Sequence, residues 1–227
     1  MCGRFVLDAP SEELAHHFNL KKKVTLEPRY NIAPSQPVII IRSAIREKEL
    51  SAVRWGLIPH WSKDEKTGYK LINARAETVR EKPSFRDAFK SRRCLIPATG
   101  FYEWKHEGRM KQPYFIKMKN GSLFAMAGIW ESWQSPEGKT IESCAIITTD
   151  ANSIVGKIHD RMPVIMSNQS YGLWLSSTGN PLQEFLRPYS PFKMTAYPVS
   201  SMINNAKNEG EGCIRKIDYQ LNRRFSR

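Results

Sequence analysis

Short apolar runs recur along this chain, and most of them are rich in β-branched or aromatic residues. Such runs, bounded by polar, Gly or Pro positions, are typical of β-strands. They predict strands over residues 2–7, 37–42, 50–58, 93–98, 101–105, 113–118, 122–130 and 143–149. Asn120 and Gly121 separate two of these runs, and this dipeptide predicts a β-hairpin between them.

Helical patterns are few and short. They predict helices over residues 10–20, 82–91 and 168–177. In the first of these, Ser11 is expected to cap the helix, and Leu14 and Phe18 are expected to share its apolar face. The pattern therefore predicts an α+β fold that is predominantly antiparallel β, with short peripheral helices.

Length and composition favour one globular domain. The chain has 227 residues, of which 41% are hydrophobic and 25% charged, enough to bury a sizeable core. Its 35 Lys and Arg outnumber its 22 Asp and Glu, which gives a net charge of +13. This excess favours a polyanion as partner. A basic protein without any nucleic-acid function is the alternative.

The four cysteines lie far apart in the chain, with no spacing typical of a metal site or a disulfide framework. We therefore expect no metal and no cofactor. The N-terminus lacks an apolar signal segment, and the longest apolar run, residues 123–130, is too short to span a bilayer. These features predict a cytoplasmic, nucleoid-associated protein whose thiols stay reduced.

Cys2 directly follows the initiator methionine. Removal of Met1 would leave an α-amine and a thiol on adjacent carbons. The amine titrates near pH 7.7 to 8.0 and the thiol near about 8.5, so both a neutral amine and a thiolate are accessible. An aldehyde would condense with the amine to an imine, which the thiol could close to a thiazolidine ring. Acyl transfer by the same thiol is an alternative.

Polar residues inside apolar segments are the candidate helpers of Cys2. Asn73 and Glu103 lie in or beside predicted strands, where an unpaired polar group would be costly. Burial would raise the pKa of Glu103 toward the range suited to proton transfer. His159 precedes another apolar segment and could act as acid or base near neutral pH. Each of the three could equally have a structural role.

Three arginines each stand two positions after Cys2 or one of its candidate helpers: Arg4, Arg75 and Arg161. Positions i and i+2 share a face in an extended strand, so these arginines would accompany the candidate site. Their guanidinium groups suit phosphates. Trp61, in a polar segment, could offer a stacking surface for a base.

Several segments together resemble the SOS-response-associated peptidase (SRAP) family of abasic-site-processing proteins. They are, in chain order, MCGRF, RYNIAPSQ, RWGLIPHW, INARAET, PSFRDAFKSRRCLIPATGFYEW, AGIWE, IHDRMPVI and YPVSSMINNAKN. The resemblance covers residues 1–212, which we expect to form the SRAP-like domain, and leaves 213–227 as a basic C-terminal tail. It implies an α+β domain around an antiparallel, barrel-like β core.

The resemblance also implies a function. Members of the family bind single-stranded DNA at abasic sites and form a covalent thiazolidine crosslink through the N-terminal cysteine, which shields the lesion. It implies catalytic roles for Cys2, Asn73, Glu103 and His159, and DNA contacts or pocket-shaping roles for Arg4, Trp61, Arg75, Thr148 and Arg161. A monomer with lyase-type activity is expected. The alternatives are a cysteine autoprotease or peptidase that uses Cys2, and a non-catalytic module that binds single-stranded DNA.

Overall fold

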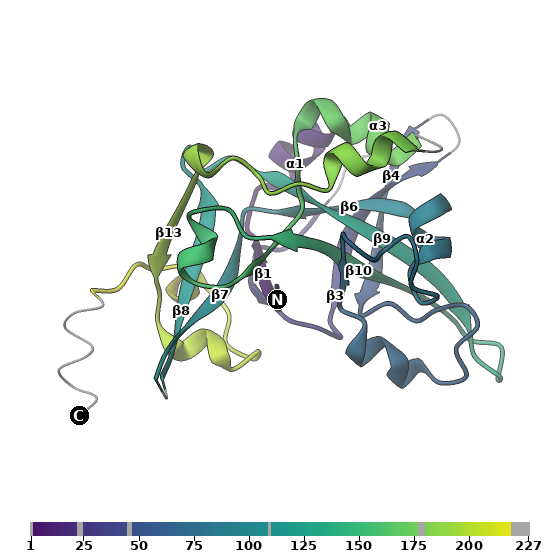
Figure 1. Ribbon diagram of the computed structural model, residues 1–227, viewed down its shortest axis with the longest axis horizontal. Coiled ribbons are helices and arrows are strands. Elements are labelled where there is room, and N and C mark those ends of the chain that lie inside the picture. Colours follow the sequence, from purple (N-terminus) through teal and green to yellow (C-terminus); the bar gives the residue numbers. More distant parts are fainter. Residues whose placement is uncertain (1, 22–24, 45–46, 109, 177–179, 219–227) are drawn as a thin grey trace.

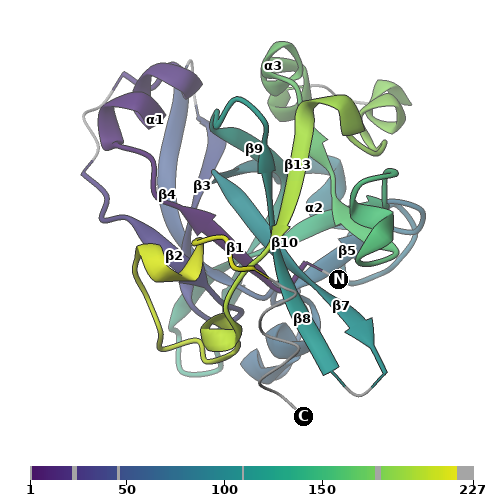
Figure 2. The same cartoon turned by 90° about the vertical axis from the view of Figure 1, so that its left-hand side faces the viewer.

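Strands dominate the structure, a computed structural model (Figure 1). It describes residues 2–21, 25–44, 47–108, 110–176 and 180–218. The strands form two sheets, and the short helices lie around them (Figures 1 and 2).

The smaller sheet carries the N-terminal strand of the chain. Its five strands pair antiparallel, in the order β13 (Met194–Pro198), β8 (Met110–Met118), β7 (Gly100–Glu107), β1 (Arg4–Leu7) and β2 (Arg29–Ile32). Strand β1 therefore lies between β7 and β2, with Phe5 opposite Phe101 on one side. This pairing brings the N-terminus against the strand that carries Glu103.

The larger sheet closes into a barrel, because β10 pairs with both β4 and β9. The strands of the ring are β4 (Glu47–Trp55), β3 (Pro37–Ala44), β6 (Arg93–Ala98), β9 (Phe124–Gln134) and β10 (Thr140–Asp150). Three short strands extend it: β5 (Asn73–Arg75), β11 (Arg161–Pro163) and β12 (Ile165–Met166). Only the pairings of β10 with β4 and β5 are parallel among those described. The expected α+β, barrel-like class is confirmed.

The described α-helices are α1 (Ser11–Phe18), α2 (Arg86–Ser91) and α3 (Tyr171–Ser176). Short 3₁₀ turns cover Glu65–Lys70, Val155–Lys157, Asn168–Ser170, Asn180–Phe185, Pro191–Lys193, Ser201–Asn204 and Glu211–Cys213. Within the described ranges, none of these helices has the length and apolar character needed to cross a membrane.

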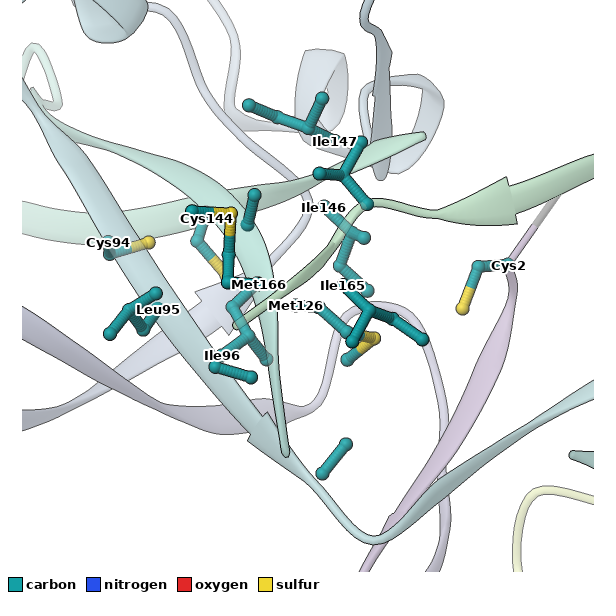
Figure 3. Packing of buried hydrophobic residues seen from close by; sticks show 14 of the residues in the cluster. Cys2, Cys94, Leu95, Ile96, Met126, Cys144, Ile146, Ile147, Ile165 and Met166 are labelled. Carbon is teal, nitrogen blue, oxygen red and sulfur yellow. The ribbon is translucent and has the colours of Figure 1, made fainter. Parts of the chain in front are cut away.

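The main apolar core fills the barrel and reaches the N-terminal strand. Cys94 and Cys144 are wholly buried in it, as expected of small apolar side chains (Figure 3). Cys2 belongs to the same cluster and lies at one side of the group drawn in Figure 3. The core thus extends to the candidate nucleophile.

Two local predictions are wrong. Ser11 is not the cap of α1, because its hydroxyl accepts a hydrogen bond from the Leu26 N–H (2.9 Å) and so ties two chain segments together. The Asn120-Gly121 turn does form, closed by the Gly121 N–H on the Met118 carbonyl (3.0 Å). It joins no hairpin, however, since β8 pairs with β7 and β13 while β9 belongs to the barrel. A turn signal is local, whereas burial of each strand's apolar face selects its partner.

The C-terminal segment packs on the smaller sheet as far as the structure describes it. Cys213 is buried, and the Ile217 N–H donates to the Pro198 carbonyl (3.0 Å). Of the predicted basic tail, residues 219–227 lie outside the described residues.

Candidate functional site

Cys2 lies just before β1 and is completely buried. Pairing of Arg4 with Tyr102 directs the N-terminal end of β1 toward the part of β7 that carries Glu103. The negative charge of Glu103 acts on the Cys2 thiol, which places the two side chains in one electrostatic environment. The predicted nucleophile and the predicted acid-base residue are therefore brought together.

The thiol of Cys2 is held in its protonated form. Burial raises its pKa strongly, and the charge of Glu103 raises it further. The positive charge of the chain's amino terminus and a hydrogen bond from the Arg4 backbone N–H lower the pKa, but by less. The expectation of an accessible thiolate near neutral pH is wrong for this buried thiol. Any reaction at sulfur needs a group that accepts its proton.

Glu103 is suited to be that group. Its side chain is only 2% exposed, and burial raises its pKa to about 7. The nearby positive amino terminus opposes this rise, while the charge of Asp160 adds to it. The prediction of a buried glutamate with a raised pKa is confirmed. Such a carboxyl group can both take and return a proton at neutral pH.

Asn73 holds the backbone of Cys2 directly. Its side-chain amide N–H donates to the Cys2 carbonyl (2.9 Å). Its Oδ1 atom is buried and has no hydrogen-bond partner among the described residues, and the same is true of Thr148 Oγ1. The two side chains come from neighbouring strands, because β5 pairs with β10. Unsatisfied buried polar atoms of this kind are costly unless a ligand or water completes them.

His159 carries a partly buried ring whose side chain is 25% exposed. Its Nδ1 lies within hydrogen-bond distance of the Arg161 backbone N–H (3.0 Å). Burial and the positive amino terminus lower the pKa of the ring, whereas the Asp160 carboxylate, 2.8 Å from Nδ1, opposes this. The ring is therefore mainly neutral at neutral pH.

The predicted arginines Arg75 and Arg161 differ in exposure and in ion-pair partners. Arg75 is exposed. Arg161 is largely buried and forms a two-point ion pair with Glu77 (2.8 Å for each contact), with a further contact to Asp150 (2.6 Å). Its positive charge is therefore offset by two carboxylates. Arg75 is the more open of the two to a phosphate.

Arg4 points to protein carbonyls rather than to solvent. Its guanidinium group donates to Asn31 Oδ1 (2.7 Å), to the Asn204 carbonyl (3.2 Å) and to the Ile203 carbonyl. Trp61 is 53% exposed, and no contact described in the structure joins it to Cys2. The guanidinium group of Arg4 is thus bonded to protein oxygens, whereas the Trp61 ring is open to solvent.

Three residues around the site were not singled out from the sequence: Asn31, Glu77 and Asp160. Each lies inside a segment that carries the family resemblance, which was the available signal. Their partners are Arg4, Arg161 and His159, respectively. Two of these contacts join segments far apart in the chain, so no local pattern predicts them.

The site combines a nucleophile, Cys2, with a proton-transfer group, Glu103. It also holds two buried polar atoms that have no hydrogen-bond partner among the described residues, Asn73 Oδ1 and Thr148 Oγ1. Among the described residues, no three His, Cys, Asp or Glu side chains gather in a way that could hold a metal ion. The chemistry available from these side chains is nucleophilic attack by Cys2, with Glu103 and His159 moving protons.

Comparison with known proteins gives the chain a family. The family model "SOS response associated peptidase (SRAP)" matches residues 1–206. The abasic site processing protein YoqW of Bacillus subtilis is 46% identical over 94% of this chain and 99% of its own length. The abasic site processing protein HMCES of Xenopus tropicalis is 33% identical over 84% of this chain and 67% of its own. A Bacteroides thetaiotaomicron crystal structure covers 95% of this chain and 100% of its own, with 30% identity and a TM-score of 0.85. The predicted resemblance is confirmed: this chain belongs to the SRAP family.

Proposed function

We propose that this protein processes abasic sites in single-stranded DNA by forming a covalent thiazolidine crosslink through Cys2. The observation that carries the proposal is a carboxyl group with a pKa of about 7, that of Glu103, buried beside a cysteine that Met1 removal would turn into a 1,2-aminothiol. The names of the relatives YoqW and HMCES, both abasic site processing proteins, support the same substrate.

The proposed reaction joins the ring-opened aldehyde of an abasic deoxyribose to Cys2. The neutral α-amine attacks the aldehyde carbon, and loss of one water gives an imine. The sulfur then adds to the imine carbon, while the thiol proton passes by way of Glu103 to the imine nitrogen. No oxidant or reductant is required. A protonated thiol beside a carboxylate that titrates near neutral pH suits this transfer.

His159 and Asn73 have supporting roles in this proposal. The partly buried His159 ring would donate a proton to the sugar oxygen during ring opening. Asn73 fixes the Cys2 backbone through its amide N–H, and its open Oδ1 would accept a hydrogen bond from the bound sugar or the nascent ring. Thr148 Oγ1 offers a second open polar atom nearby.

The DNA path would run past β5, where Arg75 is exposed. We keep Arg4, Trp61 and Arg161 as proposed members of this path. The guanidinium groups of Arg4 and Arg161 already bond protein oxygens, so they would act on DNA mainly by shaping the surface. The protein would act as a monomer in the cytoplasm, in association with the nucleoid.

A peptidase that uses the Cys2 thiolate is less well supported. Burial and the Glu103 charge disfavour the thiolate that a cysteine peptidase requires. A non-catalytic module for single-stranded DNA would need the net charge of +13 but no buried carboxyl group beside Cys2.

The test is incubation with single-stranded DNA that contains one abasic site, followed by a denaturing gel. The wild-type protein should give a covalent band that survives heating. Cys2→Ala should give none, yet retain most of its non-covalent affinity for single-stranded DNA, because exposed cations rather than the thiol supply that affinity.

A matched control keeps the thiol and removes only the adjacent amine. One extra residue that is not cleaved off before Cys2 should abolish the band, since a thiazolidine needs both groups on one residue. A full-yield, heat-stable crosslink from this extended protein, or from Cys2→Ala, would contradict the proposal. If the protein cleaved an unstructured peptide in a Cys2-dependent way and gave no covalent protein–DNA band, the peptidase would be favoured.

A further inference from the structure

Asn31 is a completely buried polar residue at the centre of a hydrogen-bond network beside the candidate site. Its side-chain amide N–H groups donate to three carbonyls of one C-terminal loop: Ile203 (3.3 Å), Asn205 (3.0 Å) and Asn208 (2.9 Å). Its Oδ1 accepts from the Arg4 guanidinium (2.7 Å). The Asn31 side chain, on β2, thus joins Arg4 of β1 to a loop that begins 172 positions further along the chain than Asn31.

The 203–208 loop also touches the strand that carries Glu103. The Trp104 indole N–H donates to Asn204 Oδ1 (2.8 Å). Arg4 donates to the backbone carbonyls of Ile203 and Asn204. Figure 2 shows this C-terminal part of the chain, drawn in yellow-green and yellow, beside β2 and β1. The loop therefore braces both the strand after Cys2 and the strand that holds Glu103.

Arg4 links this network to the nucleophile itself. It stands two positions after Cys2, and its pairing with Tyr102 sets the N-terminal end of β1 beside the part of β7 that carries Glu103. The guanidinium group has no ion-pair partner within the described part of the chain, so neutral oxygens alone hold it in place. If the side chain of Arg4 were released, the N-terminal end of β1 would lose its side-chain ties to the loop that also holds Trp104, the neighbour of Glu103.

We propose that Asn31 is a positioning residue for Cys2: its buried amide locks Arg4 and the 203–208 loop into one arrangement, and so keeps the N-terminal end of β1, which Cys2 precedes, in place beside Glu103. The inference rests on the proposed function, because it concerns the same nucleophile. It also gives a physical role to the segments RYNIAPSQ and SMINNAKN, which supply the two halves of the network.

A double-mutant cycle tests whether Asn31 acts through Arg4. Asn31→Ala and Arg4→Met should each lower the rate constant of crosslinking at saturating DNA by about tenfold, since the nucleophile loses its alignment. The double variant should react no more than about twofold more slowly than Arg4→Met alone, because Asn31 then no longer reaches β1 through the Arg4 side chain. The proposal would be overturned if the rate losses of the two single variants multiplied in the double variant. It would also be overturned if either single variant crosslinked at the wild-type rate.

Ser11→Ala is the matched control. Like Asn31, Ser11 bonds a backbone group of a distant segment, but it lies in α1 and not at the site. Its crosslinking rate should stay within about twofold of wild type. If Asn31→Ala is not folded at the assay temperature, Arg4→Met alone still tests the link, since an unchanged rate in that variant would contradict it.

A second measurement does not depend on DNA. Alkylation of Cys2 by iodoacetamide at pH 8, followed by mass spectrometry of the Cys2 peptide, reports how accessible the buried thiol is. In the wild-type protein the thiol is completely buried. If Asn31→Ala loosens the N-terminal end of β1, the rate of alkylation should rise by more than about threefold, while Ser11→Ala should leave it unchanged.

The two measurements separate the two proposals. If the wild-type protein forms no crosslink but the alkylation rate rises in Asn31→Ala, the proposed function fails while the positioning role stands. If crosslinking occurs and the alkylation rates of wild type and Asn31→Ala agree, the positioning role is wrong and the proposed function stands.

Discussion

At the scale of single residues, the site depends on the cost of burying charge. Glu103 is 2% exposed, and burial keeps its pKa near 7, well above that of a carboxyl group in water. The same burial holds the Cys2 thiol protonated and the His159 ring mainly neutral. Groups that would be fully charged or fully neutral at the surface can therefore exchange protons near neutral pH.

A prediction about Glu103 follows from the sign of this shift. The folded state prefers the protonated carboxyl, so Glu103 lowers the stability of the protein as pH rises from about 4.5 to 7. Glu103→Gln removes the charge. Relative to wild type, its free energy of unfolding should be about 2 kcal/mol more favourable at pH 8 than at pH 5. Its crosslinking rate should fall, because glutamine cannot carry a proton.

Urea unfolding at the two pH values measures this effect. Glu81→Gln, a change at an exposed glutamate, is the control and should show no such difference between pH 5 and pH 8. A Glu103→Gln variant whose stability relative to wild type is independent of pH would mean that the carboxyl group ionises normally in the folded protein.

At the scale of elements, the site is assembled by pairing of β1 with β7 and of β5 with β10. The positions of Asn73 and Glu103 in apolar segments were enough to predict that they are buried or partly buried. The sequence also predicted the strand after Cys2 and the apolar face formed by Leu14 and Phe18. These are local patterns of apolar and polar residues.

Long-range partners were not predictable in the same way. The contacts of Arg161 with Glu77 and of Asn31 with the 203–208 loop join positions 84 and more than 170 apart in the chain. No local period encodes such contacts. The Asn120-Gly121 dipeptide likewise encodes a turn but not the sheet that each flanking strand joins. Arg4 was expected to face a phosphate, yet its guanidinium group bonds three protein oxygens.

Gly100 offers a test of how tightly β7 is packed. A Cβ atom at this position would lie 2.2 Å from Phe115 Cζ and 2.9 Å from the Ile116 carbonyl oxygen. Gly100→Ala should therefore destabilise the protein by about 1 to 3 kcal/mol in urea unfolding. Gly172→Ala in α3 is the control, since its added Cβ meets no atom within 4 Å. It should be neutral or stabilising by up to about 1 kcal/mol. Equal effects of the two changes would contradict the packing argument.

At the scale of the whole molecule, the net charge of +13 does not act as a uniform field. Some of the arginines are paired within the fold: Arg161 is held by Glu77 and Asp150, and Arg42 by Glu49 and Glu142. Such pairs contribute little net attraction for a phosphate. In the proposed function, exposed cations such as Arg75 would therefore carry more of the affinity for DNA than their number alone implies.

The salt dependence of binding tests this difference. Binding of single-stranded DNA is measured over a salt series, and each lost phosphate contact should reduce the slope of log K against log salt by about 0.7. Arg75→Ala should show this reduction. Arg161→Ala should change the slope less, because two carboxylates already offset its charge.

Truncation after Asp218 removes Arg223, Arg224 and Arg227, and should weaken binding at low salt while leaving the crosslinking rate at saturating DNA unchanged. If Arg161→Ala or the truncation flattened the slope and Arg75→Ala did not, the DNA would take a path away from β5.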